Sequence, residues 1–150
     1  MILISACLAG IECRYDGGSN EHKEIKKLIE EKKAILVCPE QLGGLTTPRT
    51  PCEILGGDGE DVLLKRAKII DKNGKDQTKG FVKGADETLK IAKLYGVTKA
   101  ILKQRSPSCG CGMIYDGTFS GTKKTGDGVT ATLLKKQGIV IWNEENHPWK

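Results

Sequence analysis

The sequence predicts an α/β protein: a three-layer, Rossmann-like domain with a mostly parallel, four-stranded sheet and a β-hairpin insertion. Two observations predict this fold. Four short apolar segments typical of buried strands occur, at residues 1–6, 34–37, 99–103 and 139–142. Between them lie segments with helical periodicity, at residues 20–33, 80–95 and 128–137. Strands that alternate with helices in this way form β-α-β units with parallel strands.

The first β-α-β unit begins with the strand at residues 1–6. A turn at residues 16–20 follows, and Ser19 or Asn20 is expected to cap a helix that runs to about Lys33. The apolar face of this helix carries Ile25, Leu28 and Ile29. The second strand then follows, and the crossover connection is expected to be right-handed.

Residues 39–61 show no periodicity and are rich in glycine and proline. A loop of this length in a compact domain is usually functional or disordered, and its position directly after Cys38 favours function. Beyond this loop, residues 66–70 and 75–78 flank the Asn73-Gly74 dipeptide. An Asn-Gly pair between two strand-like segments predicts a β-hairpin.

The second helix, at residues 80–95, can be capped by Thr78 and ended by Gly96. Its inner face carries Phe81, Ala85, Leu89 and Ala92. The third strand leads into a second long loop, and Gly138 stops the last helix before the final strand. We therefore expect the hairpin to be an insertion in an otherwise regular alternation of strands and helices.

The composition fits one domain over residues 1–150, with 38% hydrophobic and 29% charged residues. No apolar segment is long enough to span a membrane, and residues 1–5 lack the basic region of a signal peptide. We therefore expect a cytoplasmic protein whose six cysteines are reduced, which favours metal binding or catalysis over disulfides. The net charge of +5 does not by itself indicate a nucleic-acid-binding protein.

Three cysteines occur where three predicted strands end. Cys7 and Cys38 directly follow the first two strands, and Cys109 follows the third after a short segment. The carboxyl ends of parallel neighbouring strands share one sheet edge, where α/β proteins bind their ligands. Three thiolates that converge there can hold an iron–sulfur cluster and leave one iron open to a substrate. The alternative is that each cysteine is an ordinary buried apolar residue.

Polar residues beside these cysteines are candidates for catalysis and substrate binding. Glu40 could act as a general acid or base, and Ser106 and Ser108 could bind a polar heterocycle or move a proton. Arg14 and Arg49 could hold an anion or a carbonyl group, although a salt bridge within the loops explains either arginine equally well. Lys103 could orient the substrate. These residue types are also common in ordinary turns, which remains the alternative.

The other three cysteines leave further functions open. Cys13 and Cys111 could join Cys7 and Cys109 in a four-thiolate zinc site, although the paired spacing of zinc ribbons is absent. Cys52 lies in the long loop. The Gly126-Asp127-Gly128 segment at a helix start could bind phosphate, so a structural zinc or nucleotide-binding module without catalysis is the alternative function. A sulfur carrier with Cys109 and Cys111 as a persulfide pair is a third hypothesis.

The motifs taken together resemble the thiouracil desulfidase family, formerly a domain of unknown function. The resemblance rests on SACLAG at residues 5–10, CRYDG at 13–17, CPE at 38–40, PR at 48–49 and SPSCG at 106–110. The segments YDGTF at 115–119 and GDGV at 126–129 extend it over essentially the whole chain.

This resemblance implies an oxygen-sensitive [4Fe-4S] cluster held by Cys7, Cys38 and Cys109. It also implies non-redox removal of sulfur from thiolated uracil bases or nucleosides, in which the open iron takes the substrate sulfur and sulfide is released. Glu40 and either Ser106 or Ser108 are the implied acid–base partners. Some relatives carry a further domain and act on tRNA, so a small thiolated pyrimidine is expected here ahead of tRNA. A homodimer is left open.

Overall fold

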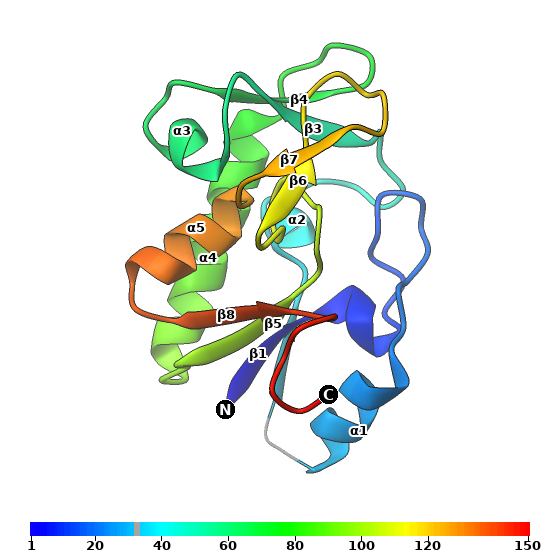
Figure 1. The fold of residues 1–150 in the computed structure, drawn as a ribbon, viewed down its shortest axis with the longest axis vertical. Helices are drawn as coiled ribbons and strands as arrows, with labels where there is room; N and C mark the ends of the chain where they lie inside the picture. The colour runs from blue at the N-terminus through cyan, green and yellow to red at the C-terminus, as the bar shows by residue number, and fades with distance from the viewer. Residues whose placement is uncertain (32–33) are drawn as a thin grey trace.

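The computed structural model describes residues 1–31 and 34–150. Its central sheet contains four strands, β1 (Ile2–Ser5), β2 (Ala34–Val37), β5 (Lys99–Leu102) and β8 (Val140–Asn143). They follow the order β2-β1-β5-β8, and every neighbouring pair is parallel. The carboxyl ends of all four strands therefore lie at one edge of the sheet (Figure 1). The predicted α/β fold with a four-stranded sheet is confirmed.

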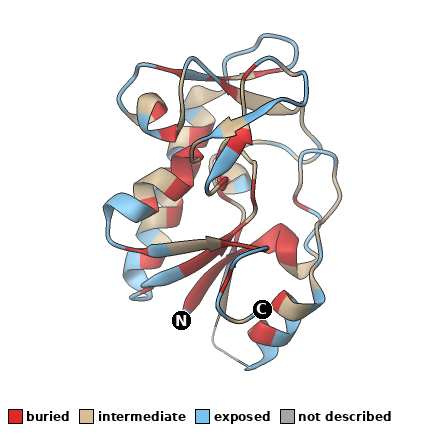
Figure 2. Cartoon of the chain, viewed as in Figure 1, coloured by how far each residue is buried: buried red, intermediate tan, exposed pale blue. Residues whose placement is uncertain are grey.

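Helices cover both faces of this sheet because alternate residues of each strand point to opposite faces. Ile2 and Ile4 pack with α1 (Lys23–Glu31), whereas Leu3 packs on the other face. That face is covered by α4 (Thr78–Leu94) and α5 (Val129–Lys136). All four residues of β1 are buried, as Figure 2 shows along the strand.

A second group of short elements lies above the central sheet in the view of Figure 1. Strand β3 (Cys52–Leu55) pairs antiparallel with β4 (Lys68–Asp71), and β6 (Met113–Tyr115) pairs antiparallel with β7 (Lys123–Thr125). Helix α3 (Gly59–Leu63) belongs to the same region. A separate apolar cluster that includes Ile54, Val62, Ile69, Phe81 and Ile114 holds β3, α3, β4 and β6 on α4. Helix α2 (Pro39–Leu42) lies nearer the central sheet, and its Leu42 packs against the apolar cluster of that sheet.

The predicted hairpin between residues 66–70 and 75–78 forms over a short length. The Gly74 N–H donates to the Asp71 carbonyl at 2.9 Å, and on either side of the turn the N–H groups of Asp71 and Gln77 donate to the carbonyls of Lys75 and Ile69, both at 2.8 Å. Residues 75–78 contribute an isolated antiparallel bridge between Ile70 and Asp76 rather than a full strand. The loop predicted over residues 39–61 is wrong in part, because β3 forms within it and pairs with the other edge of β4, where Ile54 is buried with Ile69.

Two predicted helix starts are also wrong. Helix α1 begins at Lys23 because the N–H groups of Asn20 and His22 donate to the carbonyls of Cys7 and Leu8. The predicted end of α1 near Lys33 lies outside the described residues. Helix α4 begins at Thr78 itself, whose hydroxyl accepts the Ile69 N–H at 2.9 Å instead of capping the helix. In the described part of the chain, no helix is long and apolar enough to cross a membrane.

Candidate active site

The three strand-end cysteines line one cavity at the carboxyl edge of the sheet. Cys7 lies in the 3-10 helix η1 (Ala6–Ala9) directly after β1, and Cys38 precedes the first residue of α2. Cys109 follows β5 across a loop of six residues, 103–108. All three border the same cavity, whose volume is about 560 Å³. The fold thus brings together residues that lie far apart in the sequence.

The thiols at this cavity are free, and the pKa values of Cys13, Cys38 and Cys109 are raised. Burial raises the pKa of the Cys109 thiol to about 12. The pKa of Cys38 is also raised, first by its hydrogen bond with Cys13 and then by burial. Cys13 itself is 2% exposed and lines the cavity. Its hydrogen bond with Cys38 lowers its pKa, but the bond with Cys7 and burial together raise it to about 11. Thiols in this state must lose protons when they bind a metal.

This donor set fits an iron–sulfur cluster, because thiolates are the ligands of such clusters. Within residues 1–31 and 34–150, no three His, Cys, Asp or Glu side chains surround a point where they could hold a single metal ion. Cys111 lies apart from the cavity lining, and its thiol donates to the Ile141 carbonyl at 3.9 Å. The structure therefore does not bring Cys111 together with Cys7 and Cys13, as the alternative zinc site requires.

Glu40 lines the cavity and forms a buried ion pair with Arg49. Their side chains are 15% and 9% exposed, and Arg49 Nε donates to Glu40 Oε2 at 2.7 Å. Arg49 Nη2 contacts the same oxygen and also donates to the Cys13 carbonyl at 3.0 Å. Arg49 Nη1 donates to Thr46 O and Thr47 Oγ1. All five N–H groups of the guanidinium are thus used within the protein, so Arg49 holds Glu40 in place.

Ser106 connects Glu40 to the loop that carries Cys109. Its hydroxyl donates to Glu40 Oε1 at 3.2 Å and accepts the N–H groups of Ser108 and Cys109, both at 3.0 Å. Because the two amides occupy the oxygen, the hydroxyl hydrogen is directed toward the carboxylate. Arg105, just before Ser106, has a positive φ of 70°, a conformation uncommon for a residue other than glycine.

Ser108 is not placed at the cavity. It is fully buried, and its hydroxyl lies 2.7 Å from Thr130 Oγ1 in the first turn of α5. Lys103 lines the cavity, but its ammonium group is 3.1 Å from Glu144 Oε1 and donates to the Gln104 carbonyl. Of the two serines, only Ser106 borders the cavity.

Arg14 lines the cavity on the loop that follows η1. Its guanidinium lies 5.7 Å from the centre of the Tyr15 ring. In the part of the chain that the structure describes, Arg14 forms no ion pair, in contrast to Arg49. Glu40 neutralises the charge of Arg49, whereas no described carboxylate pairs with Arg14 at the cavity.

Several residues at the cavity were not singled out by the sequence. Glu53, on β3, accepts the N–H groups of Gly117 at 2.9 Å and Phe119 at 3.3 Å through Oε1. Tyr15, Tyr115 and Phe119 also line the cavity. The YDGTF motif at residues 115–119 was the sequence feature that could have pointed to Tyr115 and Phe119, because it belongs to the loop that Glu53 binds.

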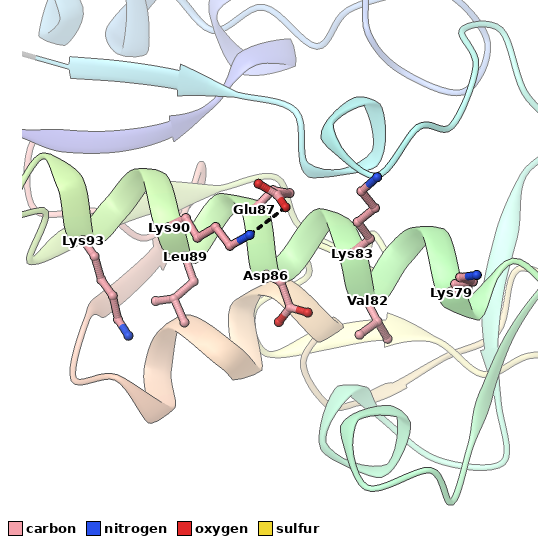
Figure 3. A pocket seen from close by; sticks show the side chains of 8 residues that line it. All are labelled: Lys79, Val82, Lys83, Asp86, Glu87, Leu89, Lys90 and Lys93. Carbon is pink, nitrogen blue, oxygen red and sulfur yellow. Dashed lines mark hydrogen bonds and ion pairs between the residues drawn. The ribbon is translucent and has the colours of Figure 1, made fainter.

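A second hollow lies on the surface of α4 and has a different character (Figure 3). Two carboxylates, Asp86 and Glu87, lie between pairs of lysines along it, and Lys90 Nζ lies 3.0 Å from Glu87 Oε1. All of its lining residues belong to this one helix, and none of them is a cysteine. Such a surface is typical of a solvated helix face, so the cavity at the sheet edge is the candidate active site.

Comparisons with known proteins identify the family and the fold. A family model described as 2-thiouracil desulfurase matches residues 2–146. The uncharacterized protein YbbK of Bacillus subtilis (strain 168) is 55% identical over 144 residues, which cover 96% of this chain and 95% of YbbK. A solved structure titled [4Fe-4S]-dependent thiouracil desulfidase TudS (DUF523Vcz) superposes with a TM-score of 0.86 at 39% identity, over 98% of this chain and 92% of that one. The predicted family is confirmed: this chain belongs to the 2-thiouracil desulfurase family.

Proposed function

We propose that this protein removes sulfur from thiolated uracil bases or nucleosides without a net redox change, using a [4Fe-4S] cluster held by Cys7, Cys38 and Cys109. The observation that carries the proposal is the convergence of these three cysteines on one cavity that Glu40 and Ser106 also line. The named structural relative is a [4Fe-4S]-dependent thiouracil desulfidase, which supports the same cofactor and substrate class here.

The overall reaction exchanges the C=S group and water for C=O and H₂S, so it needs no oxidant or reductant. When bound, the cluster would supply an iron without a protein ligand, a Lewis acid for the thiocarbonyl sulfur. Glu40 Oε1 is the general base for the water that attacks the thiocarbonyl carbon, and it holds the proton that later leaves with the sulfur.

Arg49 and Ser106 position the Glu40 carboxylate for this role. Arg49 contacts Oε2 and leaves Oε1 to Ser106. The Ser106 hydroxyl hydrogen is directed at Oε1 by the two amides that its oxygen accepts. Because Ser106 bonds to the amide of Cys109, the base and one proposed ligand belong to a single hydrogen-bonded unit. Arg14, which forms no ion pair within the described part of the chain, is proposed to bind the substrate carbonyl.

Two alternatives are less well supported. A phosphate site at the start of α5 requires free N–H groups, but those of Gly128, Val129 and Thr130 donate to carbonyls of the loop at residues 107–110. A persulfide pair requires Cys109 and Cys111 to act together, but Cys111 donates to a strand carbonyl away from the cavity.

The proposal is tested by variants of Glu40 and Ser106 in anaerobically reconstituted protein. Glu40→Gln removes the base and is expected to lower kcat for 2-thiouracil by about 10²–10⁴-fold, the usual contribution of general acid–base catalysis. Ser106→Ala is expected to have a smaller effect, because the carboxylate remains. Iron content should equal that of the wild type in both variants. Full activity of Glu40→Gln, or no turnover of any thiolated pyrimidine by the wild type, would contradict the proposal.

The cellular setting is part of the same proposal. All six cysteines are free, which is the state expected in a reducing compartment such as the cytoplasm. A small thiolated pyrimidine is proposed as the substrate ahead of tRNA. The homodimer stays a prediction.

A further inference from the structure

Aromatic side chains gather at the candidate active site. The chain has two phenylalanines and three tyrosines, and the cavity is lined by Phe81, Phe119, Tyr15 and Tyr115. A chain in which only 5% of residues are aromatic thus places most of its phenylalanine and tyrosine side chains around one cavity. A planar heterocycle is the class of ligand that such a lining binds, because aromatic rings stack on it.

Two of these four rings have another structural role. Phe81 is 2% exposed and packs in the apolar cluster that also contains Ile54 of β3 and Ile69 of β4. Tyr15 is 41% exposed, and the Arg14 guanidinium already lies over its ring. Tyr115 is the last residue of β6, and its backbone pairs with Lys123 of β7 in a regular strand. The positions of Phe81 and Tyr15 are thus explained without a ligand, and the backbone of Tyr115 is unstrained.

Phe119 has no such explanation, and its backbone is unusual. Its φ is +56°, in the left-handed region that a bulky residue rarely adopts. It is half-buried at the cavity, in the connection between β6 and β7. Residues in sparsely populated backbone conformations persist only where the surrounding structure fixes them, and they cluster at ligand-binding sites.

Glu53 is the residue that fixes this conformation. Its Oε1 accepts the N–H groups of Gly117 and Phe119, on either side of Thr118. Gly117 lies so close to β3 that a Cβ atom there would be 2.6 Å from the Ile54 carbonyl oxygen. The carboxylate and the close approach together fasten the loop to β3, so the Phe119 ring is held at the cavity before any ligand arrives.

We propose that Phe119 is the stacking surface for the pyrimidine ring of the substrate and that Glu53 is the positioning residue that holds Phe119 at the cavity. This inference rests on the proposed function and extends it, because it states that the face of the Phe119 ring recognises the face of the substrate heterocycle. Stacking on a ring is tolerant of the ring's substituents. Phe119 therefore accepts 2-thiouracil, 4-thiouracil and their oxygen product alike, and other residues discriminate between them.

The test measures binding of uracil, the unreactive product, to the reconstituted holoenzyme by equilibrium dialysis. Phe119→Ala is expected to weaken uracil binding by about tenfold or more, the loss typical of one base–aromatic stack. Phe119→Tyr should stay within about threefold of the wild type. In turnover of 2-thiouracil, Phe119→Ala should raise KM more than it lowers kcat. Tyr95→Ala, at an exposed aromatic residue beyond the end of α4, is the matched control.

Glu53 provides the second arm of the test. Glu53→Gln keeps an oxygen that can accept the two N–H groups and should retain uracil affinity, whereas Glu53→Ala should lose it to the same extent as Phe119→Ala. Equal uracil affinity of Phe119→Ala and the wild type would overturn the inference, even if the wild type desulfurates thiouracil. Conversely, a wild type that binds uracil through Phe119 but releases no sulfide would support this inference and refute the proposed function.

Discussion

The buried ion pair between Glu40 and Arg49 gives the sharpest prediction about stability. The two side chains are only 15% and 9% exposed, and all five N–H groups of Arg49 are used. Removing one partner of a buried pair leaves an uncompensated charge and costs about 3–5 kcal/mol. An exposed pair contributes about 0.2–1 kcal/mol at most. We therefore expect Arg49→Ala to lower the free energy of unfolding by about 3–5 kcal/mol.

A double-mutant cycle separates the pair from its surroundings. The free energy of unfolding is measured by urea denaturation for the wild type, Arg49→Ala, Glu40→Ala and the double variant, under reducing conditions without iron. The coupling energy is expected to be about 2 kcal/mol or more, because the double variant no longer buries a lone charge. The same cycle on Lys90 and Glu87, which are 68% and 36% exposed, should give about 0.5 kcal/mol or less.

The reasoning would be refuted if the coupling between Arg49 and Glu40 were no larger than that between Lys90 and Glu87. Arg49→Lys is the conservative control. Lysine keeps the charge but offers three donors without the planar fork, so it should restore only part of the lost stability.

The remaining predictions concern the cysteines and one buried histidine. Replacing a proposed ligand, by Cys7→Ser, Cys38→Ser or Cys109→Ser, should lower the iron bound per chain after anaerobic reconstitution. The variant Cys111→Ser should retain its iron, because Cys111 donates to a strand carbonyl away from the cavity. Equal iron in all four variants would contradict the proposed ligand set. His147 is 4% exposed, and neither ring nitrogen has a hydrogen-bond partner among the described residues, so burial lowers its pKa despite nearby carboxylates. The unfolded state then binds more protons than the folded state below about pH 6.5, so the free energy of unfolding should fall as pH drops through that range, by at most about 1.4 kcal/mol per pH unit. His147→Phe should flatten this dependence in urea denaturation, and parallel wild-type and variant curves would exclude the assignment.

Four charged or titratable groups surround His147 and enter that prediction. The carboxylates of Glu24 and Glu144 raise its pKa, and the neighbouring Lys150 and His22 lower it. Burial is the largest effect, which fixes the direction of the pH dependence.

The central sheet could be predicted because each of its strands is a short apolar segment between amphipathic helices. Once the strands are parallel neighbours, the positions of Cys7 and Cys38 at the sheet edge follow from topology alone. Glu40 could be found for the same reason, since it lies two residues after Cys38 in the first turn of α2. Local sequence patterns therefore predict the position of a residue where the regular alternation of strands and helices alone decides which residues are its neighbours.

The outer elements could not be predicted, because their stability depends on distant partners. Strands β3, β6 and β7 have three or four residues each and show no clear alternation of apolar and polar side chains. Glu53 holds the loop only through hydrogen bonds from the amides of Gly117 and Phe119, which lie 64 and 66 residues further along the chain. Likewise, nothing in the sequence distinguishes Ser106 from Ser108, and only the folded loop directs one toward Glu40 and the other into the core.

Anaerobic reconstitution with a joint count of iron, acid-labile sulfide and released uracil tests the central claim most directly. We predict about four irons and four sulfides per chain, as a four-iron cluster requires, and release of uracil and hydrogen sulfide from 2-thiouracil in equal amounts. Stable zinc binding with no iron or labile sulfide, together with no uracil release from any thiolated pyrimidine, would contradict the account.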